Sequence, residues 1–171
     1  MLNDFVRMIW EQKVEAIVML TNLIEEGKVK CEKYWSDAGE AQFGEITVKL
    51  AATKSFADYI IRSFEMFKVR HYSTGSDKEV TRTFTQFHFT SWPDKSVPVT
   101  PWSLVEFLKR VSAQTTKSPV VVHCSAGVGR TGTFIALHSV IRQAQDTGRV
   151  DFYQTLAKLR QDRIFMIQTA V

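Results

Sequence analysis

A cysteine and an arginine stand six positions apart, at Cys124 and Arg130, in a segment whose composition suits phosphate binding. Gly127 and Gly129 lie between them and let the backbone curl so that successive N–H groups point inward. The β-branched run before Cys124 predicts a buried strand, and the apolar spacing after Arg130 predicts a helix whose N-terminus faces the loop. The Arg130 guanidinium can donate to two phosphate oxygens at once. The segment therefore predicts a phosphate cradle.

Cys124 stands at the mouth of this cradle, and the GxxxxGK[ST] pattern of nucleotide-binding loops is absent. A helix N-terminus and an adjacent guanidinium both stabilise a thiolate and lower the pKa of a cysteine. A thiolate in this position can attack phosphorus in line and form a phosphocysteine. For an isolated cysteine, a small buried apolar residue is the better interpretation. Here the strand, the glycines and the helix together favour a nucleophile.

Cleavage of a phosphate ester also needs a proton donor, which the cradle lacks. Thirty residues before Cys124, Trp92-Pro93-Asp94 follows a predicted strand and precedes a proline-containing turn. Loops of this kind commonly close over a substrate and exclude water. Asp94 could then protonate the leaving oxygen and later accept a proton from water. In isolation, Asp94 would be interpreted as a turn-capping residue before a helix.

Several predicted elements must position these residues. Residues 119–122 predict a buried strand, and residues 131–144 predict an amphipathic helix that Gly148 ends. No repeat, linker or change of composition divides the chain, so the mixture of strands and helices indicates one α/β or α+β unit. Periodicity, turn residues and capping residues predict the other elements: a helix around 5–12, a strand over 16–20, antiparallel strands over 43–86 with a turn at 73–78, a helix from Thr100-Pro101, and a helix from Asp151 with Phe152, Leu156 and Leu159 on one side.

Composition narrows the class of protein. The 171 residues suffice for one domain, and their 44% apolar content is typical of a soluble, folded chain. The net charge of +4 mildly favours anionic partners, but no basic run points to nucleic acid. No apolar stretch is long enough to span a membrane, and charges at Asp4 and Arg7 argue against a secretory leader. Cys31 and Cys124 lack CxxC spacing, which indicates a reducing compartment rather than a disulfide scaffold or zinc site.

The segment from His123 to Thr131, taken with Trp92-Pro93-Asp94, resembles the catalytic domain of the classical cysteine-based protein tyrosine phosphatases of the receptor-like type. Further matching stretches lie at residues 8–12, 25–35, 87–94 and 166–169, so the resemblance covers nearly the whole chain. It implies a twisted mixed sheet flanked by helices and the hydrolysis of phosphotyrosine in proteins. It implies phosphotyrosine-containing proteins as partners, and neither a metal nor an organic cofactor.

The resemblance also implies roles for matched residues. Cys124 matches the nucleophile, Arg130 the phosphate-binding arginine and Asp94 the general acid and base. The remaining matches support these three: Thr131 assists departure of the thiolate, His123 helps to hold the thiolate, Gln168 positions the hydrolytic water, Glu25 orients the Arg130 guanidinium, and Lys30 approaches Asp94. Substrate phosphate is expected to lie against a loop that works with Asp94 and Gln168 and consists of Cys124, Ser125, Ala126, Gly127, Val128, Gly129 and Arg130.

Residues with weaker signals have simpler interpretations. Without the resemblance, Glu25 would be one of two adjacent carboxylates at a helix end, and Cys31 is expected to be a core thiol. The other histidines are expected to be structural: His71, His88 and His138. Arg160 and Arg163 either support the loop of the glutamine, attract an acidic phosphopeptide or lie on a solvated helix face.

Compared with the family pattern, residues 1–171 are expected to be a partial domain that is cut at both ends. No Asn-Arg-Tyr motif precedes Met8, and Val171 comes before the second glutamine and final helix of the pattern. The receptor-like resemblance implies a cytoplasmic domain, tethered to a membrane only through parts outside this chain. Two alternatives remain open: a non-catalytic phosphotyrosine-binding or regulatory phosphatase-like domain, and a broader phosphatase that acts on phosphoserine or lipid phosphates.

Overall fold

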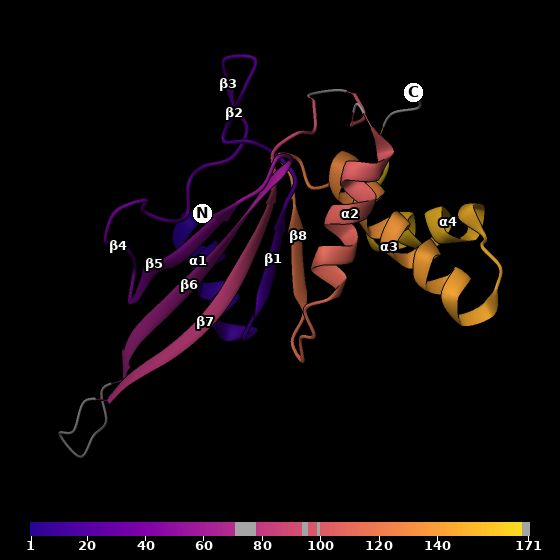
Figure 1. The fold of residues 1–171 in the computed structure, drawn as a ribbon. Coiled ribbons are helices and arrows are strands. Elements are labelled where there is room, and N and C mark those ends of the chain that lie inside the picture. The colour runs from indigo at the N-terminus through magenta and orange to yellow at the C-terminus, as the bar shows by residue number, and fades with distance from the viewer. Residues whose placement is uncertain (71–77, 94–95, 99, 169–171) are drawn as a thin grey trace.

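A twisted mixed sheet with helices on both faces forms the centre of the computed structural model, which describes residues 1–70, 78–93, 96–98 and 100–168 (Figure 1). This architecture confirms the expected α/β (α+β) class. Within the described residues the sheet has the strand order β4-β5-β6-β7-β1-β8. These strands are β1 (Ala16–Met19), β4 (Glu40–Phe43), β5 (Ile46–Ser55), β6 (Tyr59–Arg70), β7 (Lys78–Phe89) and β8 (Val120–His123).

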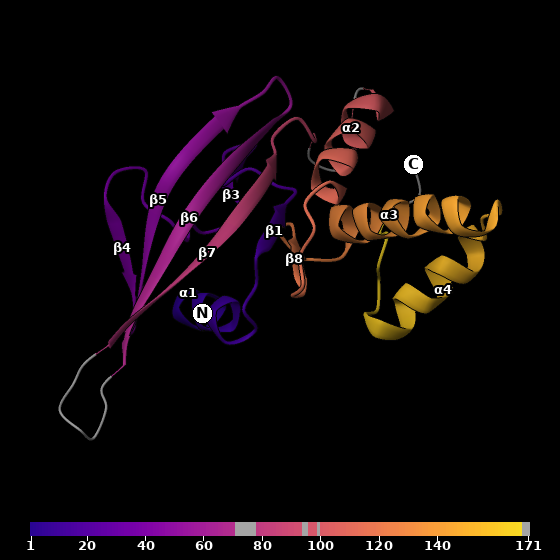
Figure 2. The same cartoon turned by 60° about the horizontal axis from the view of Figure 1, so that its bottom comes forward.

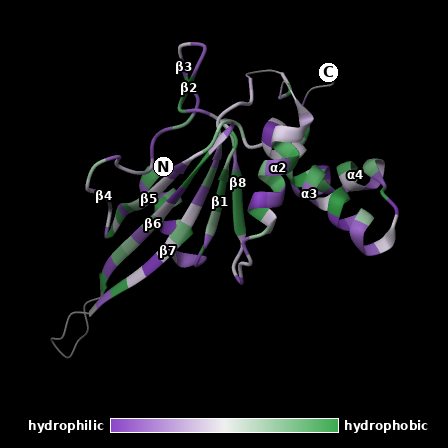
Figure 3. Cartoon of the chain, in the orientation of Figure 1, coloured by the Kyte–Doolittle hydropathy of each residue, from purple (hydrophilic) through white to green (hydrophobic). Residues whose placement is uncertain are grey.

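Strand β1 lies between β7 and β8 and runs parallel to both. All four of its residues are buried, because helices cover both of its faces. The apolar run predicted as a strand at residues 16–20 is therefore confirmed. Most residues of β8 are hydrophobic as well (Figure 3). Met19 pairs with His123, and the Leu20 N–H donates to the His123 carbonyl at 2.9 Å. This bond continues the ladder to the point where both strands end.

Strands β4 to β7 are joined in antiparallel pairs, as the sequence predicts for residues 43–86. The long β6–β7 pair runs from Tyr59 opposite Phe89 to Arg70 opposite Lys78. The predicted turn at 73–78 lies almost entirely outside the described residues.

Helix α1 (Leu2–Glu11) covers one face of the sheet, whereas α2 (Pro101–Ser112) and α3 (Gly129–Thr147) cover the other (Figure 2). The predicted start of α2 is confirmed, with Thr100 as the N-cap and proline in the first turn. Gly148 has a φ of 68° and ends α3 in the left-handed conformation that favours glycine. None of the described helices has the length and apolar character needed to cross a bilayer.

Helix α4 (Phe152–Asp162) begins as predicted, because the Asp151 side chain accepts a hydrogen bond from the Gln154 N–H at 2.8 Å. The apolar side of α4 is more exposed to solvent than the helical spacing of its apolar residues predicts. Leu156 and Leu159 are half-buried, but Phe152 is 66% exposed and no α4 residue is fully buried. The reason is that α4 packs along α3 at the margin of the fold rather than against the sheet.

Residues 24–29 form an element that the sequence did not predict, a short hairpin of β2 (Ile24–Glu25) and β3 (Lys28–Val29). Glu25 therefore lies on a strand, and its interpretation as a helix-end carboxylate is wrong. Two-residue strands are too short to show any periodicity, so no pattern in this segment predicted them.

Two apolar clusters, one on each face, hold the sheet against its helices. The first joins α1 and Trp35 to one face of the sheet, and the second joins α2 and α3 to the opposite face. Phe107 of α2 is fully buried in the second cluster, where its ring lies 5.3 Å from that of Tyr59, 5.1 Å from that of Phe89 and 5.9 Å from that of Phe134.

The sheet topology also decides where chemistry can occur. Because β7, β1 and β8 are parallel neighbours, the segments that follow them leave the sheet at one edge. Ligands of α/β proteins bind at such carboxyl ends of strands. The segments beginning at Thr90, Leu20 and Cys124 therefore converge.

Replacement of Phe107 by alanine should lower the free energy of unfolding by about 3–5 kcal/mol, because it leaves a cavity between α2, α3 and the sheet. Urea denaturation of the chain measures this loss. Trp102, also on α2, is 76% exposed, so Trp102→Ala is the matched control and should change stability by less than about 0.5 kcal/mol. Equal losses from the two variants would contradict the assigned packing.

Candidate active site

The loop from Cys124 to Val128 joins β8 directly to α3. Gly127 has a φ of 70°, a conformation that costs glycine little and lets the chain turn back on itself. Val128 is the N-cap of α3 but makes no side-chain cap bond. The first N–H groups of α3 thus remain available to the loop, and the positive end of the helix dipole points at it.

The Cys124 sulfur accepts hydrogen bonds from this loop and from the first turn of α3. The Gly127 N–H and the Thr131 hydroxyl each donate to Sγ at 3.2 Å. Burial by itself would raise the pKa of the Cys124 thiol, but the Thr131 hydroxyl and backbone N–H groups, including those of Gly127 and Val128, bring the pKa below its ordinary value. The geometry therefore favours a thiolate at the start of α3.

Arg130 is held in a two-pronged ion pair with Glu25. Its two terminal nitrogens donate to the two carboxylate oxygens at 2.6 and 2.9 Å, and it also donates to the Leu20 carbonyl at 3.0 Å. Both side chains are nearly buried, with exposed fractions of 12% and 8%. Burial would raise the pKa of Glu25, but hydrogen bonds from Arg130 and the Asn22 N–H lower it. The structure thus joins β2 to α3 across the sheet edge.

His123 lies beneath the loop, in a largely apolar setting. Its Nε2 is 3.1 Å from the Tyr34 hydroxyl, and its Nδ1 is 3.4 Å from the Cys124 carbonyl oxygen. The rings of Phe5 and Tyr34 pack against the imidazole. Burial lowers the pKa of His123, so the imidazole is neutral at neutral pH.

The segment around Gln168 packs against the first turn of α3. The Ile167 N–H donates to the Val128 carbonyl at 3.0 Å. Arg160 donates to the Met166 and Ile167 carbonyls at 3.0 and 3.2 Å, so it supports the glutamine segment. Arg163 instead donates to the Ala126 carbonyl at 3.1 Å and so supports the cysteine loop.

A cavity of about 600 Å³ opens over the loop and brings most of the sequence-predicted residues together. Trp92, Ser96 and Val97 also line it, so residues on both sides of Asp94 border the cavity. Asp94 itself lies outside the described residues, and so does His71. The predicted residues that line the cavity are Glu25, Lys30, Cys124, Ser125, Ala126, Gly129, Arg130 and Gln168.

The family comparison agrees with this geometry. A family model described as protein-tyrosine phosphatase matches residues 1–171, the whole of the chain. The chain belongs to the protein-tyrosine phosphatase family. The phosphatase resemblance inferred from residues 92–94 and 123–131 is thereby confirmed.

Similar phosphatases include receptor-type members. Tyrosine-protein phosphatase 69D of Drosophila melanogaster is 41% identical over 98% of the chain and 12% of its own length. Receptor-type tyrosine-protein phosphatase alpha of Homo sapiens is 43% identical over 98% of the chain and 21% of its own length. Receptor-type tyrosine-protein phosphatase epsilon of Rattus norvegicus is 42% identical over 99% and 24%, respectively. The chain thus spans less than a quarter of each of these phosphatases.

Reasoning from the sequence missed several side chains that support the residues around the cysteine loop. Tyr34 contacts His123, and Thr21 donates to Glu25 at 3.1 Å. Tyr34 lies inside a stretch that matches the family, which was the only available signal. Cys31 packs against the first apolar cluster as expected, and His88 is buried with hydrogen bonds to neighbours.

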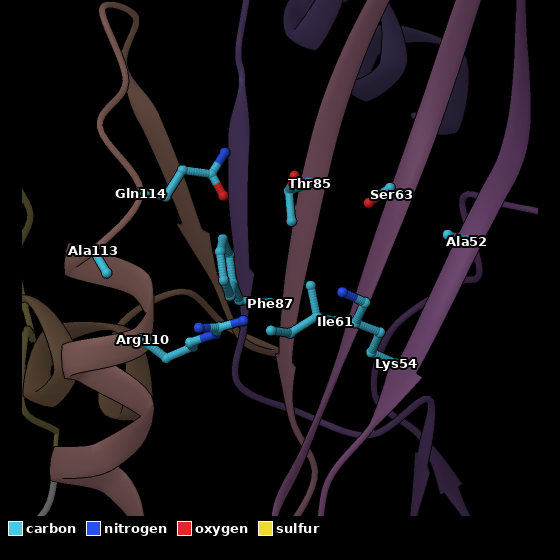
Figure 4. A pocket seen from close by; sticks show the side chains of 9 residues that line it. All are labelled: Ala52, Lys54, Ile61, Ser63, Thr85, Phe87, Arg110, Ala113 and Gln114. Atoms are coloured by element: carbon cyan, nitrogen blue, oxygen red, sulfur yellow. The ribbon is translucent and has the colours of Figure 1, made fainter.

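A second cavity, of about 290 Å³, lies away from the cysteine loop, between α2 and the sheet (Figure 4). Phe87 and Ile61 line it together with Lys54 and Arg110, and none of the described cysteines or carboxylates borders it. It therefore lacks the groups that the chemistry of the loop requires. The part of the chain that the structure describes contains no cluster of three or more His, Cys, Asp or Glu side chains suited to a metal ion.

The two cysteines should differ in reactivity. The pKa of Cys124 is lowered, whereas burial and the neighbouring Glu32 raise the pKa of Cys31. At neutral pH, peroxide should therefore oxidise the Cys124 thiolate to a sulfenic acid, with release of water, before it modifies Cys31. Mass spectrometry of peptides after timed exposure measures the order.

Thr131→Val removes one hydrogen-bond donor to the sulfur and should slow modification of Cys124 severalfold at neutral pH, because the pKa of the thiol rises. The same variant should leave the rate at Cys31 unchanged. Modification of Cys31 ahead of Cys124 would overturn the thiolate assignment.

Gly132 should be intolerant of a side chain, because a Cβ atom there would lie 2.6 Å from the Ile167 backbone nitrogen. Gly132→Ala should lower the free energy of unfolding by about 1–3 kcal/mol through this overlap. Within a helix, a glycine-to-alanine change normally stabilises by about 0.5–1 kcal/mol, so the sign is diagnostic. Thermal and urea unfolding measure the stability of Gly132→Ala and of the control Gln145→Ala, which changes an exposed residue of α3. A Gly132→Ala chain as stable as this control would refute the contact.

Proposed function

We propose that the chain hydrolyses phosphotyrosine in proteins through a phosphocysteine intermediate. One observation carries the proposal: the Cys124 sulfur accepts hydrogen bonds from the start of α3, beside an arginine held in place by Glu25. The lowered pKa favours the thiolate, which is the nucleophilic form of the sulfur, and the loop N–H groups with the Arg130 guanidinium complement the negative charge of a phosphoryl group.

In the first step the Cys124 thiolate attacks phosphorus in line, and the bond between phosphorus and the tyrosine oxygen breaks. The carboxyl group of Asp94 donates its proton to that oxygen, so a neutral phenol leaves. Glu25 holds the Arg130 guanidinium beside the cysteine loop, where its positive charge complements the transferring group. His123 holds the loop from beneath through the Cys124 carbonyl.

In the second step a water molecule attacks the phosphocysteine, and the phosphorus–sulfur bond breaks to release inorganic phosphate. The Asp94 carboxylate accepts the proton of this water, and Gln168, which lines the cavity, orients it. The Thr131 hydroxyl stabilises the departing thiolate through the hydrogen bond it already donates. The remaining loop residues that bind the phosphate oxygens are Ser125, Ala126, Gly127, Val128 and Gly129.

The proposal extends to the protein of which this chain is part. Residues 1–171 represent part of one phosphatase domain, whose substrates are phosphotyrosine-containing proteins. The similarity to receptor-type phosphatases supports a cytoplasmic location for this domain, with any membrane attachment outside the chain.

Turnover of an aryl phosphate such as para-nitrophenyl phosphate tests the proposal. Cys124→Ser should lower kcat by at least about 1000-fold, because the nucleophile is lost. Cys31→Ser is the matched control and should change kcat less than about twofold, since Cys31 packs in the first apolar cluster. Equal rates for the wild type and Cys124→Ser would overturn the mechanism.

Rapid acid quench separates the proposal from a non-catalytic binding domain. Asp94→Asn should slow turnover and still bind a phosphotyrosine peptide, and in the wild type the quench should trap phosphate on Cys124. Peptide binding without any trapped phosphocysteine would indicate the binding domain instead. A preference for phosphoserine over phosphotyrosine peptides would indicate the broader phosphatase.

A further inference from the structure

A line of polar side chains runs through the core from β6 to the underside of the cysteine loop. Arg62 donates to the Gln86 side-chain oxygen at 2.8 Å, and the Gln86 amide donates to the Tyr34 hydroxyl oxygen at 2.7 Å. The Tyr34 hydroxyl is 3.1 Å from His123 Nε2, and His123 Nδ1 is 3.4 Å from the Cys124 carbonyl. Gln86 is fully buried, and Tyr34 is 2% exposed. The middle of the line therefore lies out of reach of solvent, whereas Arg62 and His123 at its ends are half-buried.

The chemistry of Arg62 gives this line a single direction. A guanidinium has only donors, so the oxygen of the Gln86 amide must face Arg62 and its NH2 group must face Tyr34. The Tyr34 oxygen then accepts from Gln86, and its own proton is free to go to His123. The Met19 sulfur, 3.8 Å from the hydroxyl, is a more distant and weaker acceptor.

The direction continues through the histidine. If Tyr34 donates to Nε2 of His123, that nitrogen carries no proton, and the proton of the neutral imidazole lies on Nδ1. Nδ1 then donates to the Cys124 carbonyl, next to the nucleophile. The tautomer of His123 is thus selected from a residue three side chains away.

A second branch leaves the same guanidinium nitrogen of Arg62. This nitrogen is 3.1 Å from His88 Nδ1, so Nε2 of His88 carries the proton and donates to the Thr21 carbonyl at 2.9 Å. The Thr21 hydroxyl donates to Glu25, which holds Arg130. Hydrogen bonds therefore link Arg62 both to His123, which contacts the Cys124 carbonyl, and to Glu25, which holds Arg130.

We propose that Arg62 is a positioning residue. It selects the Nδ1–H tautomer of His123 and, through His88, orients the Thr21 residue that donates a hydrogen bond to Glu25. Arg62 itself does not line the cavity. The proposal concerns the same site as the proposed phosphatase function and rests on it for its effect on catalysis. Arg62 itself is held over the face of Trp35, with its guanidinium carbon 4.9 Å from the ring centre.

The protonation states fit this arrangement. Burial lowers the pKa of His123, and burial together with Arg62 lowers the pKa of His88 to about 4, so both imidazoles are neutral at neutral pH. Burial also lowers the pKa of Arg62, while the charge of Asp37 opposes that change. A guanidinium nevertheless stays protonated at neutral pH, and so it remains a donor to both branches.

Two substitutions alter the direction of the line in different ways. Arg62→Met removes the donor, so the Gln86 amide can rotate and His123 should become a mixture of tautomers. Gln86→Glu offers Tyr34 only an acceptor, so the Tyr34 proton turns toward position 86 and His123 should protonate on Nε2 instead. Nitrogen-15 NMR of the imidazoles reads the tautomer directly and does not depend on turnover.

Arg82→Met is the matched control. Like Arg62, Arg82 on β7 lies over a tryptophan, with its guanidinium carbon 4.3 Å from the Trp10 ring centre, and it donates to the Trp10 backbone carbonyl. Both variants remove an arginine of the sheet that covers an indole, so a general loss of packing should appear in both. Thermal unfolding of each chain measures that loss.

The expected result is a changed His123 tautomer in Arg62→Met and Gln86→Glu, and the wild-type Nδ1–H tautomer in Arg82→Met. Arg62→Lys keeps a charged donor and should restore the Nδ1–H form. With aryl phosphate, kcat should fall about threefold to tenfold in Arg62→Met relative to Arg82→Met at unchanged KM, the size expected for loss of one hydrogen bond.

An unchanged Nδ1–H tautomer in both Arg62→Met and Gln86→Glu would overturn the proposal. So would equal kcat values for Arg62→Met and Arg82→Met in a chain that turns over. If the wild type lacks turnover but its tautomer responds as expected, the proposed function fails whereas the positioning by Arg62 stands.

Discussion

A cysteine sulfur that accepts hydrogen bonds at the start of a helix is the constraint on which the structure depends. The N–H groups that stabilise the thiolate exist only where α3 begins, so β8 must end at His123 and the loop must turn within a few residues. Gly127 permits the turn, and the Val128 carbonyl accepts N–H bonds from both Gly132 and Ile167. The position of the sulfur thus decides where a strand, a helix and the glutamine segment meet.

The polar groups around the cysteine loop are buried in hydrogen-bonded pairs beside the two apolar clusters, and these pairs hold the loop in place. Arg130 and Glu25 satisfy one another at the sheet edge, and the His123 imidazole lies between Tyr34 and the Cys124 carbonyl. Buried polar groups are costly unless each has a partner. Among the described residues, every buried side-chain nitrogen and oxygen has a hydrogen-bond partner. A satisfied network of this kind favours one arrangement of the site, because any rearrangement would leave a buried group unpaired.

Elements with strong local signals were predictable, and those without were not. The continuous apolar run predicted β1, and the Thr100-Pro101 pair predicted the start of α2 through its helix-capping chemistry. α3 begins at Gly129, two residues before the predicted start, because its first turn contains glycine and carries no apolar periodicity. The β2–β3 hairpin that holds Glu25 is too short to have a pattern. For α4, spacing predicted the helix but not the exposure of Phe152, which depends on where α3 ends.

The sequence by itself determined the cradle, because strand, loop and helix are contiguous and their chemistry is local to residues 120–134. It also determined the family, through motifs spread along the chain. The resemblance implied that Glu25 orients Arg130, and the tertiary structure shows the contact between them across more than a hundred residues. Tertiary structure alone decided that Arg62 reaches His123 through Gln86 and Tyr34. The path from Arg62 to His123 follows from the order of strands in the sheet, which brings β6, β7, β1 and β8 side by side, whereas Glu25 reaches Arg130 from the β2–β3 hairpin outside that sheet. Strand order is a property of the packed whole, and no single segment encodes it.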